Sequence, residues 1–130
     1  VHIFAKEVLL LSKCLPVTFG IEAPYVMNIE FDSVLQNASS TIKDSNIRPD
    51  LVATYSGETI YIEISVSSSC KQEKIIEFRR LDFTVIEVYL QNFEPASDVM
   101  TLEEVKKCIE YADKKWLNIK PDGHIGSLVN

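Results

Sequence analysis

The sequence predicts an α/β fold in which helices flank a mixed β-sheet. Three observations carry this prediction: the length, the change between helical and strand-like periodicity, and the order of the resulting segments. The chain has 130 residues, which suits one domain spanning residues 1–130. Apolar residues make up 46%, enough for a packed core. The segments run helix, three strands, helix and strand, an αβββαβ order that is followed by a last helix.

The N-terminal third predicts one helix and one strand. Residues 2–14 are good helix formers without Gly or Pro, and Pro16 would end the helix. Residues 25–35 alternate loosely and include Tyr, Val, Ile and Phe, which favours a strand. Residues 36–46 are rich in Ser, Asn, Asp and Thr, and we expect a loop there.

The central segment predicts a β-hairpin. Residues 51–55 form a short strand, and residues 59–66 alternate, with Ile or Val at every even position on one face and Glu63 on the other. Ser56-Gly57 suits a two-residue turn between these strands. The hairpin is therefore predicted to be antiparallel and tightly connected.

The segment after the hairpin predicts a helix and a buried strand. Residues 71–82 have helical spacing, and residues 83–90 are strongly apolar. A helix that connects two strands of one sheet makes a right-handed crossover. Strand 83–90 should therefore lie beside strand 59–66 and run parallel to it.

The last predicted helix follows a loop over residues 92–100. Thr101 opens this helix, because Glu104 three residues later completes a capping box. Apolar residues recur at helical spacing as far as Trp116. His124 is expected to lie in a C-terminal tail.

Charge and composition limit the function classes. The net charge is −6, which disfavours non-specific nucleic-acid binding, so phosphate contacts would have to be local or made through a metal. No apolar run approaches the roughly 18 residues of a membrane span, so we expect a cytoplasmic protein without a membrane partner. The chain opens on Val1, which suggests a trimmed or partial chain. The three cysteines include no CxxC pair and are expected to be reduced thiols.

Asp50 and Glu63 are the candidate metal ligands. With a Ser56-Gly57 turn, counting five steps back along each strand places Asp50 directly opposite Glu63, whereas a turn at Gly57-Glu58 would place it opposite Ser65. Two opposed carboxylates repel unless a cation lies between them, and their oxygens suit Mg²⁺ or Mn²⁺. Taken singly, each acid could simply face solvent.

A lysine at the start of the next helix would complete the site. Lys74 could reach the two carboxylates from a helix packed over the sheet, and there it would orient or help deprotonate an attacking water. Lys71, one turn earlier, is the rival candidate. Either lysine could instead be an ordinary solvated surface residue.

The ordered set of these motifs resembles the PD-(D/E)xK nuclease superfamily, and more narrowly its bacterial and phage branch related to competence protein CoiA. The resemblance rests on residues 48–52 (RPDLV), residues 62–67 (IEISVS), Lys74 and residues 85–88 (VIEV). Weaker matches are the "LHxxAK" helix, at His2, Ala5 and Lys6, and the "KxWL" element, at Lys114, Trp116 and Leu117.

The resemblance implies a restriction-endonuclease-like fold that hydrolyses DNA phosphodiester bonds with Mg²⁺ or Mn²⁺. Asp50, Glu63 and Lys74 would be catalytic. The metal would be held by Asp50, Glu63 and the backbone carbonyl of Ile64. Ser65 stands where the superfamily usually has its lysine, so Lys74 would supply the amine.

Two positions depart from the family pattern. Ser68 replaces the histidine of a "VTH" motif, and Gln36 stands where a glutamate is frequent. Glu30 could replace that acid if the alignment is offset. The residues expected to face phosphates are His2, Lys6, Lys71, Arg79 and Arg80.

Three function classes follow. The first is a Mg²⁺-dependent nuclease acting on DNA. The second is a catalytically silent domain of the same fold that binds nucleic acid or protein, which Gln36, Ser68 and the acidic charge favour. The third is an unrelated α/β domain. A homodimer, or a larger parent protein that contains this chain, remains open.

Overall fold

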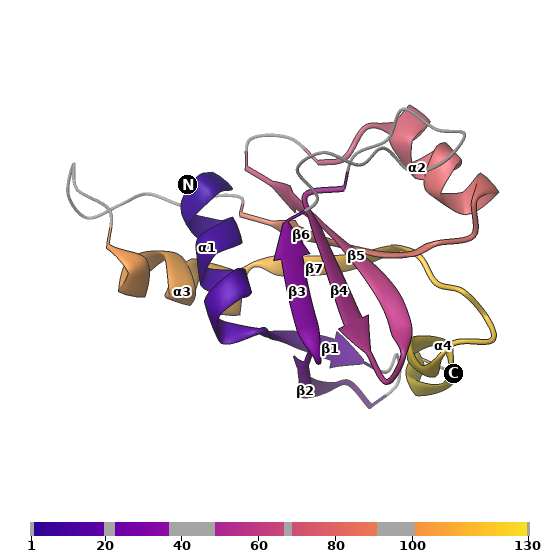
Figure 1. Cartoon of the computed structure of the whole chain (residues 1–130), viewed down its shortest axis with the longest axis horizontal. Helices are drawn as coiled ribbons and strands as arrows, with labels where there is room; N and C mark the ends of the chain where they lie inside the picture. The colour runs from indigo at the N-terminus through magenta and orange to yellow at the C-terminus, as the bar shows by residue number, and fades with distance from the viewer. Residues whose placement is uncertain (1, 20–22, 37–48, 67–68, 91–100, 130) are drawn as a thin grey trace.

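The computed structural model describes residues 2–19, 23–36, 49–66, 69–90 and 101–129. Five consecutive strands follow the first helix, and helices and strands alternate after them (Figure 1). In chain order they are α1 (His2–Ser12), β1 (Cys14–Phe19), β2 (Tyr25–Glu30), β3 (Ser33–Gln36), β4 (Leu51–Tyr55), β5 (Glu58–Ser65), α2 (Gln72–Arg80), β6 (Thr84–Tyr89), α3 (Leu102–Tyr111), β7 (Asp113–Asn118) and α4 (His124–Val129).

The main sheet has five strands in the order β3-β4-β5-β6-β7, and β1 pairs with β2 in a second sheet. Strands β3, β4 and β5 are successively antiparallel, β6 is parallel to β5, and β7 is antiparallel to β6. The predicted mixed α/β class is therefore confirmed. The parallel pairing of β5 with β6, connected through α2, is also confirmed.

The turn between β4 and β5 sets their register. Ser56 and Gly57 both have positive φ, 49° and 81°, which is the geometry of a type I′ turn. Tyr55 pairs with Glu58 and Leu51 with Ile62, so the Ser56-Gly57 turn is confirmed and the Gly57-Glu58 alternative is excluded.

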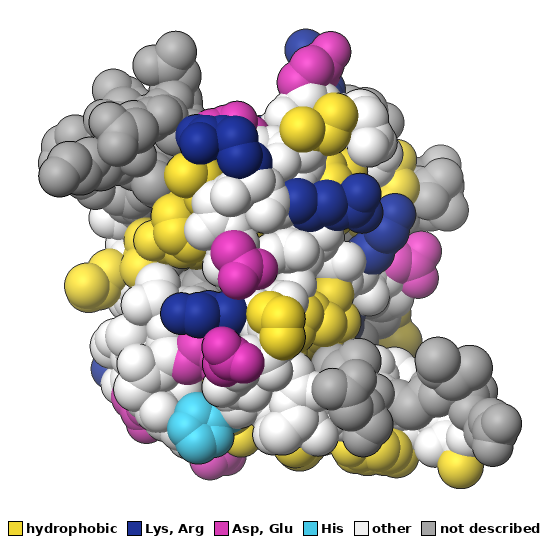
Figure 2. All heavy atoms as spheres, turned by 90° about the vertical axis from the view of Figure 1, so that its right-hand side faces the viewer, with side chains coloured by type: hydrophobic (Ala, Val, Ile, Leu, Met, Phe, Trp, Pro, Cys, Tyr) yellow, Lys and Arg dark blue, Asp and Glu magenta, His cyan; other side chains and the backbone are white. Residues whose placement is uncertain are grey.

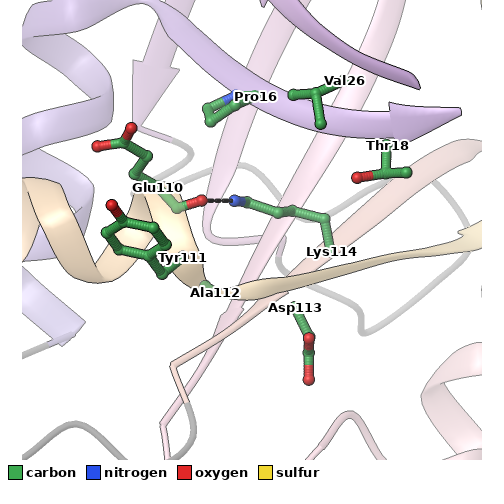
Figure 3. Close-up of a pocket in the computed structure, with 8 residues that line it drawn as sticks. All are labelled: Pro16, Thr18, Val26, Glu110, Tyr111, Ala112, Asp113 and Lys114. Atoms are coloured by element: carbon green, nitrogen blue, oxygen red, sulfur yellow. Dashed lines mark hydrogen bonds between the residues drawn. The ribbon is translucent and has the colours of Figure 1, made fainter. Parts of the chain in front are cut away.

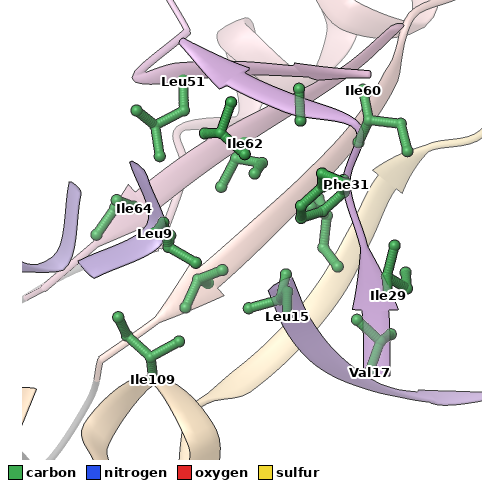
Figure 4. Packing of buried hydrophobic residues seen from close by; sticks show 14 of the residues in the cluster. Leu9, Leu15, Val17, Ile29, Phe31, Leu51, Ile60, Ile62, Ile64 and Ile109 are labelled. Atoms are coloured by element: carbon green, nitrogen blue, oxygen red, sulfur yellow. The ribbon is translucent and has the colours of Figure 1, made fainter. Parts of the chain in front are cut away.

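The main core lies on one face of the five-stranded sheet. Helix α1 packs against α3, β3 and β5, and α3 also contacts β1. The isoleucines of β5, Ile60, Ile62 and Ile64, belong to this core and are buried. Figure 4 shows them facing side chains of α1, α3 and the β1–β2 sheet, among them Leu9, Leu15 and Ile109.

A smaller core lies on the other face, beneath α2. Ile75 and Phe78 of α2 pack against Val85 of β6 and Leu117 of β7. Phe78 is fully buried, whereas Ile76 of the same helix is 55% exposed. The small core therefore holds α2 against the sheet by one apolar stripe.

Several predicted boundaries were wrong. The predicted strand 25–35 is two strands in two sheets, interrupted at residues 31 and 32, and residues 14–19 form the unpredicted β1. Helix α1 ends at Ser12 because Lys13 adopts a positive φ of 54°. Pro16 tolerates a strand position because β1 pairs with β2 alone in the described residues.

The C-terminal region also differs from the prediction. The Thr101 cap is confirmed, since its hydroxyl accepts a hydrogen bond from the Glu104 backbone N–H at 3.2 Å. Helix α3 ends at Tyr111, however, and Trp116 lies on β7, where its ring is tilted by 37° against that of Phe19. β7 forms because β6 offers its free edge for pairing. His124 begins the short helix α4 rather than lying in a tail.

Among the described helices, none has both the length and the apolar character that crossing a bilayer would require.

Candidate functional site

Asp50 and Glu63 lie opposite each other where β4 begins, at the upper end of the sheet in Figure 1. The pairing of Leu51 with Ile62 extends by one step to this pair. The Asp50 backbone N–H donates to Glu63 Oε1 at 3.3 Å, and the Ile64 N–H donates to Asp50 Oδ2 at 2.8 Å. The predicted juxtaposition of the two acids is therefore present.

Lys74 reaches this pair from α2. Its Nζ donates to Glu63 Oε2 at 2.7 Å and lies 6.0 Å from the centre of the Phe78 ring. Lys71 is the N-cap residue of α2 and its side chain is exposed. The helix therefore brings Lys74, rather than the rival Lys71, to the carboxylates.

Lys6 approaches the same pair from α1, on the opposite face of the sheet. Its Nζ lies 3.8 Å from Asp50 Oδ1, and both side chains are about one-fifth exposed, at 20% and 19%. Among the described residues, each carboxylate thus has an ammonium group beside it, and the two ammonium groups come from different helices. The formal charges of these four side chains sum to zero.

Glu63 is a buried acid, only 6% exposed. Burial raises its pKa above the ordinary value of 4.5, and the Asp50 charge adds to the rise. The hydrogen bond and charge of Lys74 lower the pKa without cancelling the effect of burial. Ionisation of Glu63 therefore lowers the free energy of unfolding, and the ionised carboxylate can bind a cation.

This shift predicts how stability depends on pH. A carboxyl with a raised folded-state pKa contributes most stability below its unfolded pKa, and the contribution is lost as pH rises through the folded pKa. Glu63→Gln cannot ionise. In EDTA, its stability relative to wild type is expected to increase as the pH rises from about 4 to about 7, because only the wild type carries a buried charge.

Urea unfolding of both proteins across that pH range measures the difference. Asp113→Asn, at an exposed position of β7, is the matched control and should show no such trend. If the difference in unfolding free energy between Glu63→Gln and wild type stays constant with pH, the raised pKa assigned to Glu63 is contradicted.

Glu87 is a third acid on this face, and sequence reasoning gave it no role. It pairs with Glu63 across the parallel strands β5 and β6 and is 3% exposed. Its Oε2 accepts hydrogen bonds from the Ser65 hydroxyl, at 2.8 Å, and from the Cys70 backbone N–H. A signal was present in the sequence, because a Glu within an apolar strand needs a local partner.

Cys70 lies beside these acids and is chemically quiet. Burial and then the charge of Glu63 raise the pKa of its thiol to about 11. The thiol therefore stays protonated near neutral pH and is a poor nucleophile. Cys14, Cys70 and Cys108 are all free thiols, as expected.

The oxygen donors suit a small divalent cation. No group of three or more His, Cys, Asp or Glu side chains in the described residues is arranged to hold a metal. Mg²⁺, however, commonly uses only one or two carboxylates together with water and substrate phosphate. The N–H and C=O of one strand residue leave on the same side, so the Ile64 carbonyl faces Asp50, as its N–H does. Asp50, Glu63 and this carbonyl therefore fit such an ion.

Other predicted positions lie apart from this pair. Arg79 and Arg80 are at the far end of α2, where Arg80 pairs with Glu77. Glu30 ends β2, in the second sheet, whereas Asp50 and Glu63 belong to the five-stranded sheet or its edge. Gln36 lies nearer: it is exposed at the end of β3 and pairs with Leu51, the residue that follows Asp50. The His2 side chain and Ser68 lie outside the described residues.

The surface around α2 has mixed charge. Figure 2 shows this side of the molecule, with Lys and Arg side chains interleaved with Asp and Glu. The visible described residues thus present no continuous basic patch. Lys71, Arg79 and Arg80 are exposed here and remain predicted phosphate contacts.

A pocket of about 530 Å³ lies elsewhere, between the β1–β2 sheet and the junction of α3 with β7 (Figure 3). Pro16 and Val26 line one side. Lys114 crosses the other side and donates to the Glu110 carbonyl at 2.8 Å. Burial lowers the pKa of Lys114. Asp50, Glu63 and Lys74 do not line this pocket, so it is separate from the candidate site.

Comparison with known proteins gives no relative: no family model, no curated protein and no solved structure matches the chain.

Proposed function

We propose that this chain is a divalent-metal-dependent nuclease domain of the PD-(D/E)xK type, with a restriction-endonuclease-like core, and that it hydrolyses DNA phosphodiester bonds. One observation carries the proposal: Lys74 Nζ lies 2.7 Å from a buried glutamate that is itself opposed to Asp50. Two acids that can hold a metal, and a lysine that can stabilise developing negative charge, suit metal-assisted hydrolysis.

Each residue has a distinct task in this proposal. Asp50, Glu63 and the Ile64 carbonyl would hold Mg²⁺ or Mn²⁺, which when bound lowers the pKa of water and polarises a phosphoryl oxygen. Lys74 holds Glu63 in place and presents an ammonium group to the developing negative charge. Lys6, beside Asp50, adds a second positive charge at the same edge.

A catalytically silent domain that binds nucleic acid or protein is the second candidate. The specific observation in its favour is that both acids already have an ammonium partner, at 3.8 Å for Asp50 and 2.7 Å for Glu63. A charge-balanced cluster needs no metal to be stable. The net charge of −6 also opposes general DNA binding.

Cleavage assays separate the two candidates. The wild type is incubated with single-stranded, duplex and branched DNA in Mg²⁺, Mn²⁺ or EDTA. We expect cleavage of at least one substrate with metal and none in EDTA. Asp50→Asn, purified identically, controls for contaminating nucleases, and Asp113→Asn controls for loss of an acid elsewhere. Absence of cleavage in every metal condition would reject the nuclease and leave the silent domain.

A further inference from the structure

Glu87 is buried, carries no catalytic assignment, and links two parts of the candidate site. Its carboxylate is 3% exposed, and no basic side chain of the described residues forms an ion pair with it. A buried acid without a cationic partner is costly, so its hydrogen bonds must offset that cost. The donors of both hydrogen bonds flank the connection between β5 and α2.

The two donors stand at opposite ends of that connection. Ser65 is the last residue of β5, two positions after Glu63, and its hydroxyl donates to Glu87 Oε2 at 2.8 Å. Cys70 lies two positions before α2, and its backbone N–H donates to the same oxygen. One oxygen atom therefore ties the strand that carries Glu63 to the start of the helix that carries Lys74.

We propose that Glu87 is a positioning residue that clasps the β5–α2 connection and thereby holds Lys74 over Glu63. The inference rests on the proposed function, because it concerns the placement of the lysine assigned to hydrolysis. A carboxyl oxygen has two lone pairs and can accept both hydrogen bonds at once, which suits a clasp. Glu87 itself touches neither Lys74 nor substrate in this role.

The chain contains a matched control for this clasp. Glu58, at the opposite end of β5, accepts a hydroxyl hydrogen bond from Thr84, at 3.0 Å, and a backbone N–H hydrogen bond from Ile125, at 3.3 Å. Like Glu87 it accepts one hydroxyl and one backbone N–H hydrogen bond, although through two separate carboxylate oxygens, and it ties α4 rather than α2. Glu58→Ala therefore tests whether loss of any clasp disturbs the site.

The first measurement follows Lys74 directly in the metal-free protein. The Cε–Hε cross-peak of Lys74, assigned by its loss in Lys74→Met, reports the ammonium contact and the nearby Phe78 ring. Glu87→Ala should move this peak toward the position of a solvated lysine. Glu87→Gln should leave it near the wild-type position, because a single amide oxygen can accept both hydrogen bonds. Glu58→Ala should not move it.

Ser65→Ala covers the case in which Glu87→Ala fails to fold. It removes one of the two donors and should move the same peak in the same direction by a smaller amount. An unchanged peak in both Glu87→Ala and Ser65→Ala would overturn the clasp. Because this readout needs no activity, a moved peak in an inactive protein would support the clasp while rejecting the nuclease.

The second measurement is a mutant cycle on DNA cleavage. Glu87→Ala should lower the rate by about 10- to 100-fold, the usual scale for a residue that orients another. In a Lys74→Met background, Glu87→Ala should lower the cleavage rate little further, because both variants remove the same function, the placement of the Lys74 ammonium group. Independent, multiplicative losses would overturn the inference. Loss of Mn²⁺ binding in Glu87→Gln would also overturn it, by making Glu87 a metal ligand.

Discussion

Replacing Lys74 with Met is expected to lower metal-dependent DNA cleavage by about 10²- to 10⁴-fold, the scale of a lost acid–base or electrostatic group. The reason is positional. Ser65 cannot supply an amine, and Lys74 Nζ is the ammonium group that hydrogen-bonds Glu63, at 2.7 Å. Rates are measured under single-turnover conditions with Mn²⁺, on whichever DNA the wild type cleaves.

Two comparisons give this result its meaning. Mn²⁺ affinity, measured by calorimetry, should change much less than the rate, because Asp50 and Glu63 remain. Lys71→Met, which removes an exposed lysine one turn earlier, should keep the wild-type single-turnover rate at saturating DNA, because a phosphate contact positions the DNA without taking part in the chemical step. If Lys71→Met loses activity while Lys74→Met keeps it, the role belongs to Lys71 and the assignment is wrong.

Replacing Phe78 with Ala should cost about 3–5 kcal/mol of unfolding free energy. Phe78 is fully buried in the small core, with 0% of its surface exposed to water. It packs there with Ile75, Val85 and Leu117. Urea unfolding measured by circular dichroism gives the difference.

The matched control for Phe78 is on the same helix. Ile76 is 55% exposed, and Ile76→Ala should change the unfolding free energy by no more than about 0.5 kcal/mol. Similar losses for both variants would mean that α2 is held by something other than its buried stripe. Because Lys74 is carried by this helix, Phe78→Ala should also weaken the Lys74–Glu63 pair.

The central hairpin could be predicted from sequence because its determinants are local. Alternation of period two assigns each side chain to a face, and a Ser-Gly pair with positive φ fixes the turn. Together they specify that Asp50 meets Glu63. The approach of Lys74 followed from the short distance in sequence between β5 and α2.

Other parts of the site depend on contacts between distant segments. The pairing of Lys6 with Asp50 requires α1 to pack beside the sheet, which no local pattern specifies. The hydrogen bonds of Glu87 likewise depend on the parallel pairing of β5 with β6.

The strands β1 and β7 were missed for a related reason. Residues 113–118 contain two lysines and an Asn, which do not favour a strand, yet they pair along β6. Residues 14–19 include Pro16, which also argues against a strand. In both cases a neighbouring strand supplied the hydrogen bonds that decided the conformation.

The type I′ turn has a consequence for how this protein can change over evolution or in the laboratory. The two acids are brought together by counting from the turn, so its length matters more than most of its side chains. Insertion of a single residue between Tyr55 and Glu58 would shift the register and send one acid to the opposite face, unless a β-bulge absorbed it. Homologues that retain the carboxylate pair should therefore vary in the identity of the turn residues while conserving their number.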